Sequence, residues 1–273
     1  MFRSLMTALG VFALVVAAGS VTAQQSNPAN SPQPSAPTST GCASVPAWNQ
    51  LRTQLNAANN AVHLTLNNDM WATIVAADGT VCAVVQSGND NLQSQWLLSR
   101  AISAQKANTA NGLSLQAGQG QKSDLKGLAL STANLWKAVQ PGGSLYGLQH
   151  SNPVDPAAAY AGSSQAFGTS TDPMVGHRIG GVNVFGGGLA LYDQNGTRVG
   201  GVGVSGDTSC RDHMVAWELR HNLNLDFVPA GVSGDNARPD NIIFDTNNGF
   251  GHPNCLDPAA EKAAAGALSP TRH

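Results

Sequence analysis

Five residues around the start of a predicted helix carry groups able to bind a small anion: Ser205, Gly206, Arg211, Asp212 and His213. Free backbone N–H groups at a helix start favour an anion such as a carboxylate. Arg211 would strengthen that preference, whereas Asp212 would oppose it. His213 offers an acid/base group, although no paired carboxylate stands at a telling spacing. The alternative, which is the commoner case, is that Asp207 or Thr208 only caps the helix.

Histidine is the side chain of this sequence best suited to hold a metal. We expect His150 and His177 to be the ligands, because both lie in a long polar stretch where a group facing a pocket is easiest to place. Neither belongs to H-E-x-x-H or another clustered ligand motif, and a single histidine is more often structural than a ligand. Arg178 follows His177 and could pair with a carboxylate of the ligand.

Glycines before the predicted helix form the spacing Gly201-x-Gly203-x-x-Gly206, and Asp226 follows at the distance expected of a dinucleotide fingerprint. The fingerprint requires the first strand of a parallel βαβ unit. Here the strand returns from an Asn-Gly turn, which predicts antiparallel pairing. The glycines are better explained by close approach of another backbone or of a flat ligand.

A pattern of strand, Gly turn, strand, Ser-Gly step and helix occurs twice, over Thr73–Ile102 and Leu189–Leu219. Asp78-Gly79 and Asn195-Gly196 each separate two runs rich in Val, Ile, Leu and Ala. An Asp-Gly or Asn-Gly pair between such runs is the strongest short-range signal for a β-hairpin. The sequence therefore predicts two hairpins, each leading into a helix.

Three helices are predicted to pack on these hairpins, over about 46–66, 90–110 and 209–223. The first has apolar residues at intervals of three and four along one face, which is typical of a helix packed on a core. Antiparallel hairpins combined with helices predict the α+β class.

Two long irregular segments accompany this framework. A Gly-, Ser-, Asn- and Pro-rich insertion covers about 112–176, with one short helix predicted near 132–139. Loops of this length are usually functional. The aromatic rings of the insertion either close over an apolar ligand or pack among themselves: Trp136, Tyr146, His150, Tyr160 and Phe167. An irregular tail is expected over about 226–273.

The N-terminus has the features of a secretory signal peptide over 1–23: a basic start, a short apolar run and small residues ending at Ala23. The run is short for a membrane span. Residues 24–41 are polar and Pro-rich, as in a flexible linker. We therefore expect an exported protein, periplasmic or extracellular, with no stable membrane span after removal of the signal.

Four cysteines follow, and in an exported chain an even number favours two disulfides. The sequence permits three pairings. We favour Cys42 with Cys82 and Cys210 with Cys255, because each bond would tie a terminal segment to one copy of the repeated pattern.

Two segments of the chain resemble the signatures of GlcG/HbpS-like proteins. Residues 101–110, AISAQKANTA, resemble the A-x-x-K-A-x-T-A helix of that family. The run from Gly186 through Gly196 to Val204-Ser205-Gly206, with Asp212 beyond, is similar to its second signature. The resemblance covers roughly Trp48 to Leu225, but the proline usual among the first glycines of that signature is missing.

This resemblance implies a profilin-like fold with a five-stranded antiparallel sheet flanked by helices, and assembly into a homo-oligomer. Members of the family are linked to haem binding, haem degradation and small hydroxy-acid metabolism. The expectation is a protein that binds haem or another tetrapyrrole, with His150 or His177 as iron ligand and Arg178 on a propionate.

Two other classes of function remain open. One is an enzyme that degrades haem or acts on a small hydroxy acid or other carboxylate, using the helix start at Ser205–His213. The other is a non-catalytic assembly module. Nucleic acid is not an expected partner, because a chain with 14 Lys and Arg, 16 Asp and Glu and no basic cluster cannot neutralise several phosphates.

Overall fold

The computed structural model describes residues 40–89, 94–121, 123 and 126–273. These belong to one unit, Ala36–His273. The predicted signal peptide and residues 24–39 of the predicted linker lie outside the described residues, so both remain predictions. Within the described part of the chain, no helix has the length and apolar character needed to cross a membrane.

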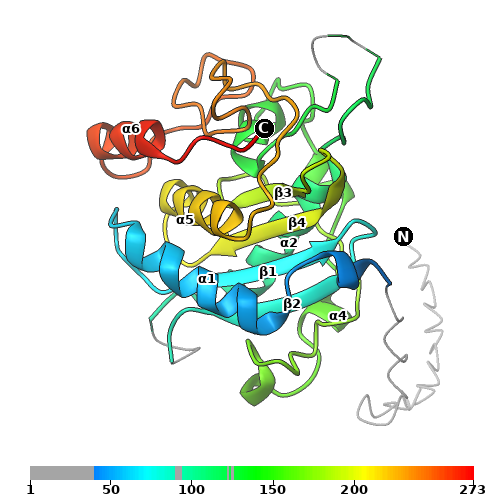
Figure 1. Ribbon diagram of the computed structural model, residues 1–273. Coiled ribbons are helices and arrows are strands. Elements are labelled where there is room, and N and C mark those ends of the chain that lie inside the picture. The colour runs from blue at the N-terminus through cyan, green and yellow to red at the C-terminus, as the bar shows by residue number, and fades with distance from the viewer. Residues whose placement is uncertain (1–39, 90–93, 122, 124–125) are drawn as a thin grey trace, which may run out of the picture. The chain divides into compact units, whose positions relative to one another are not determined.

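The core of the fold is an antiparallel sheet made of two hairpins (Figure 1). Strands β1 (Trp71–Ala76) and β2 (Val81–Gln86) form the first, and β3 (Gly188–Tyr192) and β4 (Arg198–Ser205) the second. The strand order is β2-β1-β4-β3. Both hairpins are therefore confirmed, and they join through antiparallel pairing of β1 with β4, which places Trp71 opposite Ser205.

Glycine is required at both hairpin turns because the backbone there is left-handed. Gly79 has a φ of +83° and Gly196 a φ of +69°, values that residues with a Cβ rarely adopt. The sheet has four strands within the described residues, whereas the family resemblance implied five. The α+β class is confirmed, but the fifth strand is not found and the profilin-like topology stays a prediction.

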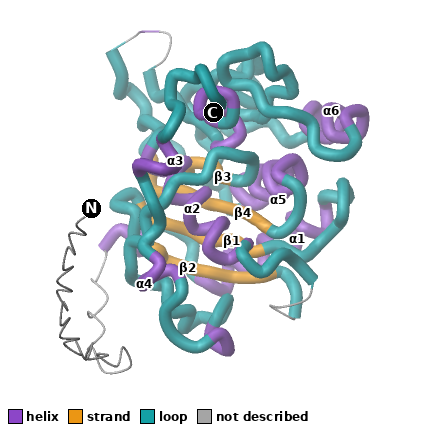
Figure 2. Tube along the Cα trace, turned by 180° about the vertical axis from the view of Figure 1, so that it is seen from behind, coloured by secondary structure: helices purple, strands orange, loops and turns teal. Residues whose placement is uncertain are grey.

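Helices cover both faces of this sheet. Helices α1 (Trp48–Ala61) and α5 (Ser209–Asn222) lie on one face and pack against each other, whereas α2 (Ser99–Gly112) covers the other face (Figures 1 and 2). Successive side chains along a strand point to opposite faces of the sheet. Ile74 therefore packs towards α1 and α5, whereas Val75 packs towards α2.

The three predicted helices are present, but the end of α1 and the start of α2 differ from the prediction. Helix α1 ends at Ala61, not at Leu66, so Leu66 lies beyond the helix and is exposed. Helix α2 begins at Ser99. The predicted start was at about residue 90. Residues 90–93 lie outside the described residues, and residues 94–98 form bends and turns.

Glycines on β4 allow α2 to approach the sheet closely. A Cβ placed on Gly203 would lie 1.9 Å from the carbonyl oxygen of Ser103, and one on Gly201 would lie 2.4 Å from that of Ala107. Neither distance is compatible with a side chain. Two explanations were considered for the Gly201-x-Gly203 spacing. The structure supports the close approach of another backbone, that of α2.

The insertion consists of short helical turns joined by loops. Its elements are η4 (Thr132–Leu135), η5 (Lys137–Val139), α3 (Leu148–Ser151), α4 (Pro156–Ala159) and η6 (Ser164–Ala166). The short helix predicted near 132–139 is thus a pair of 3-10 turns.

The predicted irregular tail contains a helix, α6 (Pro258–Ala267), so this prediction needs correction. Asp257 accepts hydrogen bonds from the N–H groups of Ala259 and Ala260, and Pro258 occupies the first helical position. An Asp cap followed by Pro is a recognisable helix start. That local signal explains why this part of the tail is ordered as a helix.

Both favoured disulfides are present. Cys42, in the turn η2 (Thr40–Ser44), is bonded to Cys82 of β2, and Cys210 of α5 to Cys255 in the C-terminal segment. Each bond ties a terminal segment to one of the two hairpin-helix units, as expected.

Candidate functional site

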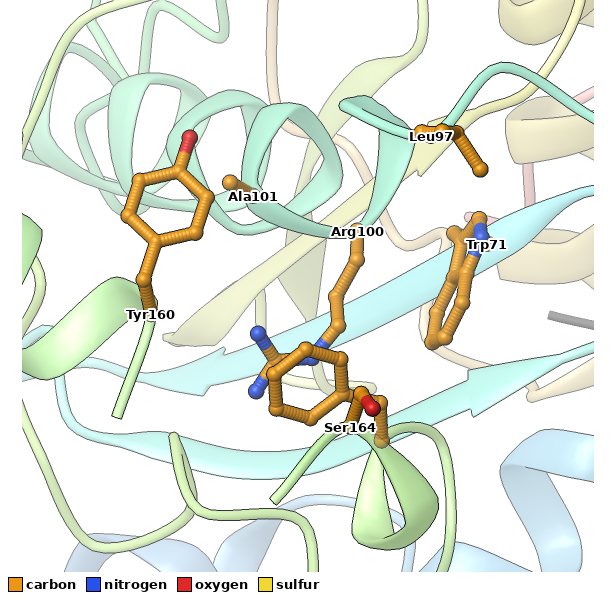
Figure 3. A pocket seen from close by; sticks show the side chains of 7 residues that line it. Trp71, Leu97, Arg100, Ala101, Tyr160 and Ser164 are labelled. Carbon is orange, nitrogen blue, oxygen red and sulfur yellow. The ribbon is translucent and has the colours of Figure 1, made fainter. Parts of the chain in front are cut away.

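An apolar cavity lies where the insertion meets the face of the sheet that α2 covers (Figure 3). Its volume is about 130 Å³. Its walls come from β1, from α2 and the turn before it, and from the insertion: Trp71, Leu97, Arg100, Ala101, Tyr160, Ser164 and Phe167. Segments far apart in the sequence thus meet at this cavity.

Arg100 holds the insertion in place against α2. Its Nε donates to Asp172 Oδ2 at 2.9 Å, and its Nη1 donates to the carbonyl oxygen of Ala159 at 2.8 Å. The guanidinium also lies 3.7 Å from the centroid of the Phe167 ring. Because Arg100 is buried and paired with a buried carboxylate, its charge is neutralised inside the protein. Arg100 therefore positions the wall of the cavity and leaves the cavity without a free cation.

Trp71 forms the opposite wall and carries an unpaired donor. The indole is 2% exposed, and its Nε1–H has no hydrogen-bond partner among the described residues. Gly168 packs so closely on this ring that an added Cβ would lie 2.9 Å from it. An unpaired buried donor costs about 1–3 kcal/mol, and this nitrogen is itself buried, so Trp71 presents its apolar ring to the cavity.

The mouth of the cavity is apolar and open to solvent. Tyr160 and Leu97 line the cavity and are 53% and 64% exposed. Trp96 and Leu98, beside Leu97 in the sequence, are also exposed. The chain thus exposes several large apolar side chains in and next to the cavity wall.

Comparison with known proteins places this chain in a family. The family model of the haem-degrading HbpS-like proteins matches residues 48–219. The chain belongs to the HbpS-like family. No curated protein matches the sequence.

Two solved structures are similar to the HbpS-like chain. The PduOC:heme complex has a TM-score of 0.42 and 22% identity, and the match covers 65% of this chain and 91% of that chain. The Klebsiella pneumoniae protein ORFY, a DUF336 protein, has a TM-score of 0.39 and 24% identity, covering 63% and 87%.

The two HbpS-like signatures meet in a buried ion pair. Lys106 of α2 donates to Asp212 Oδ2 of α5 at 2.7 Å and to the carbonyl oxygen of Val204 at 3.0 Å. Burial raises the pKa of Asp212 to about 6, although Lys106 opposes that shift. Burial likewise lowers the pKa of Lys106. Both side chains are inaccessible to a ligand, so this pair connects the two helix layers of the scaffold.

The predicted anion site at the start of α5 is occupied by the protein itself. Thr208 caps the helix by accepting the N–H of Arg211. The Arg211 guanidinium donates to the carbonyl oxygens of Val62 and Asn68 and lies 3.5 Å from Asp207. Ser205 and Gly206 are close by in the chain, yet they too are buried and do not line the cavity.

His213 lies deep in the core rather than in a cleft. Its Nε2 is 3.1 Å from Asn241 Oδ1, and its Nδ1 has no partner among the described residues. Burial lowers the pKa of this histidine to about 3. A neutral, inaccessible imidazole cannot exchange protons with a ligand near neutral pH.

The structure places the predicted metal ligands outside the cavity. His150 is exposed on α3, and His177 is half-buried in the loop before Arg178. Arg178 is exposed and paired with Asp78. Among the described residues, the only close group of three metal-ligating side chains is Cys210, Cys255 and Glu261, and its two sulfurs form a disulfide.

Two of the insertion's aromatic residues line the cavity, Tyr160 and Phe167. The sequence offered two roles for these rings, closing over an apolar ligand or packing among themselves. Trp136 instead lies beside His252, with ring centroids 6.0 Å apart. The residues from β1 and α2 were missed, because no local pattern separates Trp71 or Arg100 from ordinary core and surface positions.

Proposed function

We propose that this protein is an exported haem-binding protein whose ligand occupies the apolar cavity. Membership of the HbpS-like family carries the proposal. The cavity supports it, because the insertion builds an apolar pocket with an exposed apolar mouth.

Only one edge of a haem molecule would fit inside the cavity. A volume of about 130 Å³ is smaller than the ~300–1,000 Å³ of pockets that enclose a whole ligand. The cavity has room for the edge of a macrocycle, and Leu97, Trp96 and Tyr160 offer apolar surface for the remainder. Arg100 is not available to a ligand carboxylate, because Asp172 neutralises it.

When bound, haem would supply an iron centre able to take a further ligand. The chain's own residues bind and shield it. Phe167 and Trp71 present aromatic surface, and the ion pair of Arg100 with Asp172 keeps Phe167 in place.

Titration of the mature protein with hemin tests the proposal. We expect a saturable shift of the Soret band, weakened at least about tenfold in Leu97→Asp, since a charge at the apolar mouth must be desolvated by the ligand. Leu66→Asp is the matched control, because Leu66 is also an exposed leucine but does not line the cavity. Absence of a saturable shift, or equal affinity of the two variants, would contradict the proposal.

Haem degradation is the second candidate function, favoured by the description of the matching family. It needs a reductant and oxygen in addition to the bound haem. Decay of the Soret band under those conditions, slower in Leu97→Asp than in Leu66→Asp, would support this function at the same cavity. A Soret band as stable as that of free hemin would contradict it.

Export and self-assembly complete the proposal. Two disulfides support an oxidising compartment, and the sequence of residues 1–23 has the features of a signal peptide. We also propose a homo-oligomer, as the family resemblance implies, which sedimentation of the mature protein would detect.

A further inference from the structure

We propose that the C-terminal segment 240–271 is an acid-sensitive cover, held on the scaffold at neutral pH by two buried histidines and tethered by a disulfide when it opens. One histidine, His213, belongs to α5, and the other, His252, belongs to the segment itself. The segment, orange to red in Figure 1, packs on α5 through α6 and the chain before it. This inference does not depend on the binding of haem.

His213 links α5 to the cover. It is fully buried, its Nε2–H donates to Asn241 Oδ1 at 3.1 Å, and its Nδ1 has no partner among the described residues. The network assigns this tautomer, because Asn241 Nδ2 is used by the carbonyl oxygen of Ala265 at 3.0 Å. The N–H of Ile242 is nearer to Asn241 Oδ1, at 2.8 Å, than to Nε2, at 3.2 Å. A second proton on the imidazole would therefore be a buried donor without an acceptor.

The charged groups around His213 offer no free anion to an imidazolium. Arg220 of α5 and Asp240 of the cover both face it, but they bind each other through hydrogen bonds of 2.6 and 2.8 Å. His252 faces it as well and would repel a second positive charge. The ring of Trp217, with its centroid 6.0 Å away, adds an apolar neighbour. Burial accordingly lowers the pKa of His213 to about 3.

His252 links the cover to the backbone before β3. It is 1% exposed, its Nδ1–H donates to the carbonyl oxygen of Pro253 at 2.7 Å, and its Nε2 accepts the N–H of Gly186 at 3.5 Å. Protonation of Nε2 would leave two donors facing each other. Lys106 opposes that charge, whereas Glu261 favours it only from a carboxylate that already accepts three backbone N–H groups. Burial lowers the pKa of His252 to about 4.

Apolar packing contributes little to the hold on the cover. Residues 240–271, all of them described, bury only three apolar side chains: Ile242, Ala265 and Leu268. The disulfide between Cys210 and Cys255 joins the cover covalently to α5. Because few apolar contacts are lost, the segment can open before the sheet unfolds, and the disulfide keeps it in place to close again.

Both histidines make this opening depend on pH in the same direction. In the open cover an imidazole titrates near 6.5, whereas in the closed cover His213 and His252 do so only near pH 3 and pH 4. The hold is therefore fully present above pH 6.5 and weakens as the pH falls. At about pH 5, each histidine should raise the equilibrium constant for opening roughly 30-fold over its value at neutral pH.

Hydrogen exchange of the full mature protein tests the proposal, with rates corrected for intrinsic exchange at each pH. Between about pH 7.5 and about pH 5, amides of the cover should lose at least about 100-fold of their protection and should exchange before those of β1 and β4. Return to about pH 7.5 should restore the protection. In His213→Gln and in His252→Gln the loss should be about 30-fold smaller than in the wild type. His150→Gln is the matched control, because His150 is exposed and lies outside the cover.

The wild type alone can refute the cover. If its amides in 240–271 exchange together with those of β1 and β4 at about pH 5, the protein opens only by global unfolding and the proposal is overturned. Unchanged protection of the cover between the two pH values also overturns it. If His213→Gln and His252→Gln both show the pH dependence of the wild type and of His150→Gln, the two imidazoles do not control the opening.

Discussion

Acidification should destabilise this protein through His213, because the folded chain keeps that imidazole neutral. Burial lowers its pKa from 6.5 to about 3. The unfolded chain takes up a proton below pH 6.5, whereas the folded chain does so only near pH 3. Stability is therefore fully present above pH 6.5 and is lost progressively as the pH falls.

The magnitude follows from the shift of the pKa. At about pH 5 the unfolded imidazole is roughly 1.5 units below its pKa, and each unit is worth about 1.4 kcal/mol, so His213 removes about 2 kcal/mol of stability. Towards pH 3 the loss approaches about 5 kcal/mol, since the full shift is roughly 3.5 units. His252 acts in the same direction, because burial lowers its pKa to about 4.

Urea unfolding at about pH 7.5 and at about pH 5 measures this effect. His213→Gln keeps a donor for Asn241 but cannot titrate, so its loss of stability between the two pH values should be about 2 kcal/mol smaller than that of the wild type. His150→Gln removes an exposed histidine and should keep the wild-type dependence. If His213→Gln loses as much stability as the wild type, the buried imidazole is not neutral and the reasoning is wrong.

Two further predictions concern the scaffold and its compartment. Lys106→Met leaves Asp212 buried without its cation and should cost about 3–5 kcal/mol in urea unfolding, whereas Lys106→Met with Asp212→Leu should cost clearly less than the sum of the single changes; additive costs would contradict the pairing. Protein recovered from the periplasm or medium should begin at Gln24 by mass spectrometry, and an intact Met1 would contradict export.

Local signals made most of the framework predictable. Each hairpin turn carries a glycine with a left-handed backbone, and such turns depend on two adjacent residues rather than on distant packing. The disulfide pairing followed from the same units, since each bond closes a terminal segment onto one hairpin. Helix α6 was missed although Asp257-Pro258 signals its start, because the tail was judged by its composition.

The candidate site was less predictable because tertiary packing decides accessibility. The helix start at Ser205–His213 has the right residue types for an anion site, but the loop after α1 fills it with carbonyl oxygens that Arg211 binds. A charged residue beside a helix start looks the same in sequence whether it faces solvent or the core. In contrast, the insertion does contribute Tyr160 and Phe167 to the cavity wall, as one of the two roles considered for its aromatic rings requires.

Helix α2 lies between the signature residues and the insertion that builds the proposed binding cavity. Lys106 joins this helix to α5, and Gly203 lets it approach the sheet; both residues come from the HbpS-like signatures. Arg100 joins the same helix to the insertion through Asp172. A change in the insertion can therefore alter the cavity without disturbing the pair of Lys106 with Asp212. Because Tyr160 and Phe167 belong to the insertion, the shape of the proposed binding cavity depends on the insertion more than on the signature residues.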